Sequence, residues 1–225
     1  MLFDEKVAAR YDQFCETDIG AYVDQVERAL LWPLLALAPN MSVFDLGCGT
    51  GAYAITLADA GCYVTGVDIS SAMLAVAHGK RPRQGMVRWV AADLAHLPFP
   101  DGTFDRGLLQ VTLEFVDDPQ QLLREAARVI SPGGRLVVGL ILATGPWAAL
   151  YRERGRREPH SVWRHARFYD TQTLAAWMGR GPDIERRGLW VGPEHWPGAE
   201  EARRRERSGE RSKGEAGFAA LAWFL

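Results

Sequence analysis

Residues 43–51 read VFDLGCGTG, an apolar run that leads directly into a glycine-rich turn. The run predicts a buried parallel strand over 42–46, and the glycines predict a tight turn into a helix over 52–60. Glycine lets a ligand approach the backbone closely. A pyrophosphate-binding loop is spaced Gly-x-Gly-x-x-Gly, whereas Ala52 stands here where the third glycine would fall. The spacing therefore disfavours a phosphate-binding loop.

Two acidic side chains stand at the ends of two successive predicted strands. Asp45 lies beside the glycine loop, where a carboxylate would repel a pyrophosphate but attract an ammonium group. Asp68 follows the strand predicted over 62–67, where a carboxylate can accept hydrogen bonds from both hydroxyls of a ribose. One acid for an amino-acid group and one for a ribose is the pattern that S-adenosylmethionine requires. The alternative is that both acids cap helices and the glycines only turn the chain.

The composition fits one globular domain with a complete α/β core, since 225 residues include 48% hydrophobic and 24% charged side chains. A net charge of −2 gives no overall attraction to nucleic acid or to an anionic membrane. The cysteines Cys15, Cys48 and Cys62 lack metal-ligand spacing and suit a reducing cytosol. No signal peptide, membrane span or metal site is expected, and a cytoplasmic location follows.

Strand and helix patterns alternate from 41 to 142, which predicts a parallel sheet that forms a cofactor-binding core. The expected strands are 42–46, 62–67, 86–91, 104–109 and 134–142, and the expected helices are 52–60, 70–79 and 118–130. The sequence Pro132-Gly133-Gly134 predicts a turn before the last of these strands.

Residues 1–40 have helical periodicity and predict a helical lid, which Pro33 is expected to split into two helices. Residues 143–187 are rich in Arg, Trp and His, and Gly145-Pro146, Glu158-Pro159 and Gly181-Pro182 predict breaks in this stretch. They predict a substrate cover that is irregular apart from one helix over 171–179.

The C-terminal residues 188–225 predict two strands, 188–191 and 218–225, that close the sheet. A polar excursion over 193–216 joins them, and its low apolar content predicts a solvated or disordered loop. We expect all of 1–225 to form a single domain.

Several stretches of the core resemble the class I S-adenosylmethionine-dependent methyltransferases. Within that family the chain is similar to the methyltransferase type 11 group, which includes the ubiquinone- and menaquinone-biosynthesis C-methyltransferases. The stretches are 43–51, 64–71, 91–94, 97–99, 104–105 and 125–138. The resemblance implies a Rossmann-like three-layer α/β sandwich with an N-terminal helical cap, and a seven-stranded, mostly parallel sheet whose last strand is antiparallel. It also implies an enzyme whose cofactor is S-adenosylmethionine.

Carried over position by position, the resemblance places Asp45 and the glycine loop on the methionine part of the cofactor and Asp68 on its ribose. Ile69 would lie along the adenine ring, Asp93 would accept from the adenine amine, and Gln110 would reach the methionine end. The full set of expected cofactor-binding residues is Tyr11, Tyr22, Asp45, Gly47, Cys48, Gly49, Gly51, Asp68, Ile69, Met73, Ala92, Asp93, Leu94 and Gln110.

Five more of these residues, besides the two acids and the glycines, have a purely structural alternative. Asp93 would cap a local turn, Gln110 would cap a helix or pack, and Ile69 would be a core residue. Tyr11 and Tyr22 resemble the aromatic lid residues of the group, whose ring faces attract a sulfonium, but two tyrosines in the core would give the same sequence.

Methyl transfer from a sulfonium is an in-line displacement that needs alignment and exclusion of water more than acid–base groups. A base matters only for a neutral hydroxyl, an acidic carbon or a protonated amine, and the candidates are His160, His165 and Glu114. Of these, His165 and Glu114 are the predicted catalytic residues. The stretch 110–115 lacks the histidine that many relatives have, and it lacks the Pro-Pro-aromatic tetrapeptide of amino-methylating enzymes that act on nucleic acid.

Six arginines and five aromatic residues fall between 147 and 169, where this family builds its substrate cover. Guanidinium groups beside aromatic rings suit a small acidic or aromatic acceptor, although a short RNA could be held in the same way. A solvated helix with aromatic residues packed on the sheet is the structural alternative. A nicotinamide-dependent oxidoreductase and a catalytically silent S-adenosylmethionine-binding protein are the other classes considered. No DNA partner is expected, and the assembly is left open between monomer and homodimer.

Overall fold

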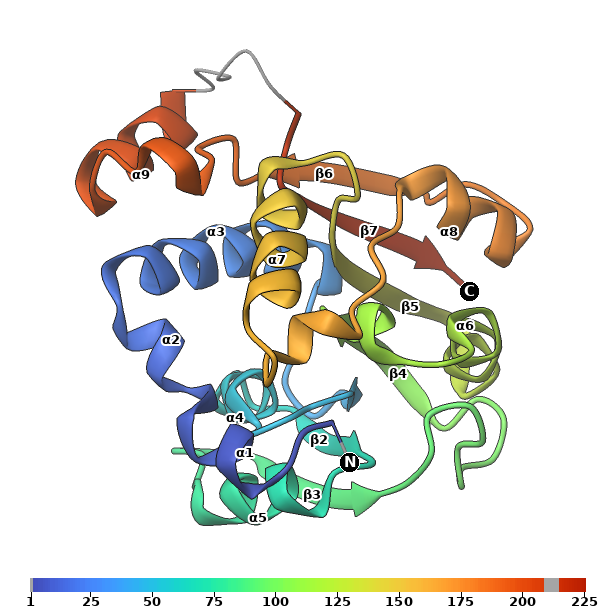
Figure 1. The fold of residues 1–225 in the computed structure, drawn as a ribbon. Helices are drawn as coiled ribbons and strands as arrows, with labels where there is room; N and C mark the ends of the chain where they lie inside the picture. The colour runs from blue at the N-terminus through green and yellow to red at the C-terminus, as the bar shows by residue number, and fades with distance from the viewer. Residues whose placement is uncertain (1, 209–214) are drawn as a thin grey trace.

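The computed structural model describes residues 2–208 and 215–225, and a seven-stranded sheet runs through them (Figure 1). Its strands are β1 (Ser42–Leu46), β2 (Tyr63–Asp68), β3 (Met86–Ala91), β4 (Phe104–Gln110), β5 (Ile130–Ile141), β6 (Ile184–Gly188) and β7 (Phe218–Phe224). They lie in the order β3-β2-β1-β4-β5-β7-β6. Strands β1 to β5 pair in parallel, and β7 pairs antiparallel with β5 and β6. The predicted sheet, with its antiparallel last strand, is confirmed.

Helices cover both faces of the sheet and give the expected three layers. They are α1 (Glu5–Tyr11), α2 (Gln13–Glu16), α3 (Asp18–Leu35), α4 (Ala52–Asp59), α5 (Ser71–Gly79), α6 (Pro119–Arg128), α7 (Pro146–Arg157), α8 (Thr171–Met178) and α9 (Ala199–Ser208), with the 3-10 turns η1 (Leu113–Phe115), η2 (Val162–Arg164) and η3 (Pro193–His195). Successive residues of a strand point to opposite faces. Val137 accordingly joins the buried cluster of α3, α4 and α7, whereas Val138 joins that of α6 and α8.

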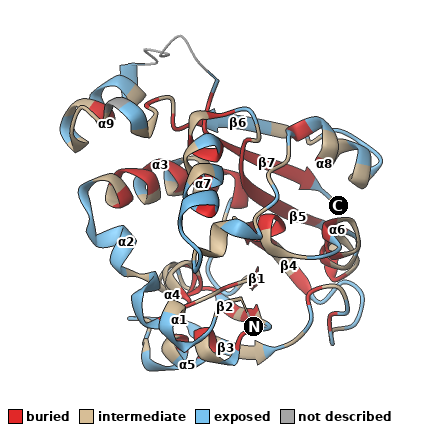
Figure 2. Cartoon of the chain, viewed as in Figure 1, coloured by how far each residue is buried: buried red, intermediate tan, exposed pale blue. Residues whose placement is uncertain are grey.

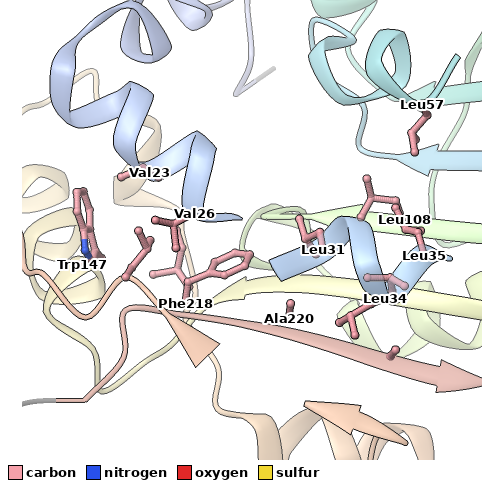
Figure 3. Close-up of a cluster of buried hydrophobic side chains, with 14 of the residues drawn as sticks. Val23, Val26, Leu31, Leu34, Leu35, Leu57, Leu108, Trp147, Phe218 and Ala220 are labelled. Carbon is pink, nitrogen blue, oxygen red and sulfur yellow. The ribbon is translucent and has the colours of Figure 1, made fainter. Parts of the chain in front are cut away.

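Helix α3 supplies much of the core on one face of the sheet. Figure 3 shows its residues Val26, Leu31 and Leu34 close to Phe218 and Ala220 of β7. Burial of one such leucine contributes about 2 kcal/mol. In Figure 2 the buried residues follow the strands and the inner faces of the helices, while the outer helix turns are exposed. In the described part of the chain, no helix combines the length and apolar character needed to cross a bilayer.

The predicted break at Pro33 is wrong, because α3 continues through this residue. Proline removes one helical hydrogen bond. It stands in the last turn of the helix, where its neighbours Leu31, Leu34 and Leu35 are fully buried. The apolar burial of these leucines offsets the lost hydrogen bond.

The cover segment contains a second helix, α7, where irregular chain was predicted. Gly145-Pro146, which the sequence presents as a break, is the start of this helix, and Pro146 occupies its first turn. A proline there is favourable because the N–H groups of the first turn have no helical partner. Similarly, the turn predicted at 132–134 lies inside β5, and the irregular register with β4 absorbs it as a bulge.

The closing strand before β7 is β6 at Ile184–Gly188, not 188–191 as predicted. Its charged residues give no apolar alternation, which is common for an edge strand. The predicted solvated or disordered loop is wrong for 193–208, because η3 and α9 occupy this stretch. Glu206 of α9 accepts hydrogen bonds from the Leu189 N–H at 2.9 Å and the Tyr22 hydroxyl at 2.9 Å. Residues 209–214 of the predicted excursion lie outside the described residues.

Candidate functional site

The glycine loop folds back onto the neighbouring strand at the carboxyl end of β1. The N–H groups of Gly47 and Cys48 donate to the Val67 carbonyl at 2.8 and 3.0 Å. Gly51 has φ +80, and a Cβ added to it would lie 2.3 Å from the ring of Trp89. A side chain is therefore excluded at Gly51 both by conformation and by contact. A Cβ added to Gly49 would meet only the Tyr11 ring, at 3.9 Å, so the loop is least crowded at this residue.

Asp68 joins this loop to the start of α5. Its Oδ2 accepts from the Gly49 N–H at 2.8 Å, and its Oδ1 accepts from the Ser70 N–H at 2.8 Å. Burial raises the pKa of Asp68, and the hydrogen bonds from the backbone oppose this change. The capping alternative thus describes part of what Asp68 does. Each carboxylate oxygen has a second lone pair that can accept from a ligand hydroxyl.

Three buried side-chain oxygens near the carboxyl ends of β1 and β4 have no hydrogen-bond partner among the described residues: Asp45 Oδ2, Gln110 Oε1 and Glu114 Oε2. Asp45 is only 2% exposed, and burial, followed by the charge of Asp68, raises its pKa to about 7. All three atoms are acceptors. Because an unpartnered buried acceptor costs free energy, this arrangement suits a ligand that carries positive charge or donor groups.

Glu27 of α3 lies in the same region, although the sequence did not suggest it. Gln110 Nε2 donates to Glu27 Oε2 at 2.7 Å, and the Tyr53 hydroxyl donates to the same oxygen at 3.4 Å. Burial raises the pKa of Glu27 to about 8. One signal could have identified it: Glu27 stands four residues after Val23 and four before Leu31, on the apolar stripe of the helix.

The N-terminal segment is attached to the glycine loop. Asp12, between α1 and α2, accepts from the Thr50 hydroxyl and from Lys80 Nζ, both at 2.6 Å. Tyr11 is 46% exposed, and its ring lies nearest to the position of a Cβ on Gly49, at 3.9 Å. Tyr11 is therefore placed beside the loop, as a lid residue would be.

Tyr22 is located elsewhere. It is fully buried, its hydroxyl donates to Glu206 of α9, and its ring packs against Trp196 at 5.2 Å between centroids. The structure thus places Tyr22 in the packing between α3 and the C-terminal segment, while the other predicted lid residue, Tyr11, stands beside Gly49.

The residues predicted for adenine follow β2 and β3, which are neighbours in the sheet. Ile69 is 58% exposed, so it is not a core residue. Asp93 accepts from the Ala95 N–H at 2.9 Å, and this bond, followed by one to His96, lowers its pKa. Asp93 therefore caps a local turn and keeps an exposed, ionised carboxylate. Met73 and Leu94 are buried and Ala92 is half-buried.

A cleft of about 740 Å³ opens between η1 and the segment around η2. Phe115 and Asp117 line one side, and Arg164, His165 and Arg167 line the other. A second hollow of about 500 Å³ shares Arg164 with the first and adds further arginines and Trp163. The predicted catalytic residue His165 therefore lines an open cleft in the segment predicted as the substrate cover.

Glu114, the other predicted catalytic residue, is 1% exposed. Its Oε1 accepts from the Ile141 N–H at 2.9 Å, and burial raises its pKa to about 7. The backbone carbonyl of Glu114 accepts from the Arg167 N–H at 2.8 Å, which joins η1 to the cover. Glu114 thus lies beneath the cleft that His165 lines.

Aromatic rings connect the lid to the cover. Phe3 contacts Phe115 at 5.1 Å between ring centroids, and Phe115 contacts Trp163 at 5.3 Å. Trp163 stacks on Tyr151 of α7 at 3.8 Å. Such contacts hold η1, η2 and the N-terminal segment together around the cleft.

Comparison with known proteins gives consistent matches. A family model described as a methyltransferase domain matches residues 44–138. The demethylmenaquinone methyltransferase of Renibacterium salmoninarum is 30% identical over 206 residues, which cover 85% of this chain and 84% of that protein. The enzyme of the same name from Beutenbergia cavernae is 40% identical over 153 residues, or 67% of this chain and 61% of that protein. Several such relatives are matched over little more than half of their length.

Solved structures share the fold over nearly the whole chain. A Thermotoga maritima protein described as an S-adenosylmethionine-dependent methyltransferase, possible histamine N-methyltransferase, has a TM-score of 0.70 and 25% identity and covers 99% of this chain and 97% of its own. Magnesium protoporphyrin IX methyltransferase from Synechocystis, with bound S-adenosylhomocysteine, has a TM-score of 0.69 at 18% identity and covers 98% of this chain and 94% of its own. At this identity the second match concerns the fold alone.

Proposed function

The chain belongs to the S-adenosylmethionine-dependent methyltransferases, in the group that includes the demethylmenaquinone methyltransferases, and from this premise we propose that it methylates a small-molecule acceptor. The demethylmenaquinone acceptor belongs to the relatives, and the acceptor of this chain is proposed below from its own cleft. The observation that carries it is the group of unpartnered buried acceptors at the carboxyl ends of β1 and β4. S-adenosylmethionine offers an ammonium group and a sulfonium to such acceptors.

The residues of the site match the parts of this cofactor. Asp45 would pair with the ammonium group, since both burial and the neighbouring Asp68 make its charge costly until a cation arrives. Asp68 would accept from the ribose hydroxyls with its free lone pairs. Ile69 and Asp93 would receive the face and the amine of adenine. When bound, the cofactor supplies a methyl group on a positively charged sulfur.

The lid and the cover provide alignment and exclusion of water, which are the main requirements of this displacement. Asp12 holds the lid on Thr50 of the loop, so Tyr11 stays beside Gly49. Tyr22 is proposed to support this segment from the core rather than to bind the cofactor. Its hydroxyl is bonded to Glu206, on the side of α9.

We propose that the acceptor is aromatic or acidic and enters through the cleft that His165 lines. Phe115 offers a ring face there, and Arg164 and Arg167 offer guanidinium groups. The only polar contact of the Arg164 guanidinium among the described residues is the Gly155 carbonyl at 3.5 Å, which leaves most of its donors available. The names of the curated relatives make a demethylmenaquinone analogue the first acceptor to test.

Calorimetric titration tests the cofactor. S-adenosylmethionine and S-adenosylhomocysteine are expected to bind, and NAD is not. Asp68→Ala should weaken the affinity for the two S-adenosyl ligands by about 100-fold or more, because charge-assisted hydrogen bonds to the ribose are lost. Absence of binding by both ligands would refute the proposal. Turnover of the analogue with methyl-labelled cofactor then separates an enzyme from a silent binding protein. Loss of turnover in the Arg164→Ala and Arg167→Ala variants would support the cleft, and unchanged turnover would remove its basis.

Location and assembly remain as the sequence suggests. We propose a cytoplasmic protein that is a monomer or a homodimer, and that has no DNA or RNA substrate. Light scattering on the purified chain measures the assembly, and labelled-methyl transfer to total RNA tests the last point.

A further inference from the structure

Glu27 is a buried carboxyl group that none of the proposed cofactor or acceptor contacts involves. It is 9% exposed on the apolar stripe of α3. Its Oε2 accepts hydrogen bonds from Gln110 and Tyr53, and no described residue forms an ion pair with it. A carboxyl group is rarely buried without a cation unless it stays protonated or has a functional role.

The groups that face Glu27 come from every element packed around it. On its own helix these are Asp24 and Arg28, and Arg28 is engaged by Asp24, Thr56 and the ring of Tyr53. The groups from the other elements are Tyr11 of α1, Cys15 of α2, Tyr53 of α4, Gln110 of β4, Glu114 of η1 and Tyr151 of α7. These neighbours are neutral or acidic. After burial, the charge of Asp24 is the largest cause that raises the pKa of Glu27.

The position of Glu27 follows from the strand order. Across the carboxyl edge of the sheet, β2, β1 and β4 are consecutive and present Asp68, Asp45 and Gln110 in turn. Gln110 holds Glu27 at the end of this row, beyond the proposed sites for ribose and ammonium. On that side lie η1 and α7, which border the acceptor cleft and its cover.

We propose that Glu27 is a catalytic residue, whose carboxylate accepts the proton that the methyl acceptor loses during transfer. This inference rests on the proposed methyl transfer. The bond between sulfur and methyl and the bond between acceptor and hydrogen break, while the bond between acceptor and methyl and an O–H bond on Glu27 form. The carboxylate and the sulfonium are charged before the step, and the carboxylic acid and the thioether are neutral after it.

This charge balance explains why a carboxyl group with acidic neighbours suits the role of proton acceptor. The positive sulfonium would favour the ionised form of Glu27, because the neighbouring cation, Arg28, is already paired with Asp24. Once the methyl group has gone, the positive charge has also gone, and the carboxylate binds a proton strongly. Proton uptake and methyl transfer therefore favour each other. Glu27 afterwards releases its proton to water.

The two residues predicted from the sequence are less suited to this role. One carboxylate oxygen of Glu114 accepts a hydrogen bond from the Ile141 N–H, and the side chain is 1% exposed, which is the setting of a structural acid. His165 lines the outer cleft beside Arg164 and Arg167, at the end of η2 and not at the carboxyl end of a strand.

Proton exchange on cofactor binding tests the proposal without an acceptor. S-adenosylmethionine and S-adenosylhomocysteine have the same amino-acid, ribose and adenine groups and differ in the charged methylsulfonium. We would titrate both ligands at pH 7 in phosphate and in Tris, whose ionisation enthalpies differ, and derive the protons released per site. With a pKa of about 8, Glu27 is about nine-tenths protonated at pH 7 before binding, so S-adenosylmethionine should release up to about 0.9 proton more than the thioether does.

The variant Glu27→Gln should abolish this difference and keep the affinity for S-adenosylhomocysteine within about threefold, since glutamine can still accept from Gln110. Glu114→Gln should retain the difference. A difference that persists in Glu27→Gln, or that is lost only in Glu114→Gln, would overturn the proposal. Failure of the unsubstituted chain to bind either ligand would refute the proposed function and this inference with it. Binding of both without any difference in protons would refute the inference alone.

Turnover provides the second readout once an acceptor is found. Glu27→Gln is expected to lower kcat by about 100-fold or more with little change in KM, which is the usual loss for a group that moves a proton in the transition state. An unchanged kcat would contradict a catalytic role even if the proton difference were observed.

Discussion

The buried carboxyl group of Asp45 should make the free energy of unfolding of the ligand-free protein depend on pH. Its carboxyl is 2% exposed, its Oδ2 has no partner, and its pKa is raised from 3.8 to about 7 by burial and then by the charge of Asp68. A carboxyl group with a raised pKa binds its proton more tightly in the folded than in the unfolded state. Its contribution to stability is therefore complete below pH 3.8 and is lost as the pH rises to about 7.

The substitution Asp45→Asn removes this titration. From the two pKa values, the ionisable side chain costs about 4 kcal/mol at pH 8 and about 1.5 kcal/mol at pH 5. The variant should thus gain about 2.5 kcal/mol more stability at pH 8 than at pH 5, relative to the unsubstituted chain. An asparagine amide without a partner has its own cost, but this cost does not depend on pH and cancels in the comparison.

The assay is urea unfolding of the ligand-free protein at both pH values, with the free energy of unfolding extrapolated to water. Asp117→Asn is the matched control, because this fully exposed side chain should change stability by less than about 0.5 kcal/mol at either pH. If Asp45→Asn shifted stability equally at pH 5 and pH 8, the reasoning about a buried, proton-binding Asp45 would be refuted. The same variant is expected to bind S-adenosylmethionine more weakly, so stability and binding change in opposite directions.

Asp93→Ala should weaken S-adenosylhomocysteine binding by about 10-fold, because one charge-assisted hydrogen bond to the adenine amine is lost. S-inosylhomocysteine lacks this amine, so in calorimetry it should bind the variant and the unsubstituted chain equally well. Equal losses of affinity for the two ligands would contradict the assignment of Asp93 to adenine. Gly51→Ala should lower the free energy of unfolding in urea by more than about 2 kcal/mol, because Gly51 has φ +80 and an added Cβ would contact Trp89. In the control variant Gly79→Ala the added Cβ has nothing within 4 Å, so stability should stay the same or increase. Similar effects of the two substitutions would contradict the requirement for glycine in the loop. Asp12→Ala removes the two hydrogen bonds that Asp12 accepts from Thr50 and Lys80. Limited proteolysis within the first 17 residues should therefore become faster, and cofactor binding should weaken about threefold to tenfold. An unchanged cleavage rate would show that these bonds do not hold the lid in place.

The core and the cofactor edge were predictable because several local signals agree there. The apolar run before Gly47, the spacing of the glycines and the acids at two successive strand ends all require the same turn at the carboxyl edge of a parallel sheet. The antiparallel last strand was expected from the family resemblance, whereas the order of the strands was not predicted, since periodicity alone does not give it.

The C-terminal half was less predictable because its helices are marked by charge and not by apolar periodicity. In α9 the signal is the spacing of Glu201 from Arg204 and Arg205, which form ion pairs three and four residues apart. In α7 a proline at the start was interpreted as a break. Glu27 was missed for the opposite reason: its position on an apolar stripe was legible, but a single acid in a lid helix is most simply interpreted as solvated.

The buried acids of the site indicate how the fold distinguishes the methyl donor from the product. Asp45 and Glu27 both have raised pKa values, so each is held partly neutral, and a bound cation would remove the cost of ionising it. The ammonium group is common to the donor and the product, and in the proposed site it would compensate Asp45 in both. The sulfonium is present only in the donor, so an acid at the acceptor side favours the donor before transfer and loses this attraction afterwards. In the proposed role, Glu27 beyond the ammonium site would therefore provide both a proton acceptor and a reason for the product to leave.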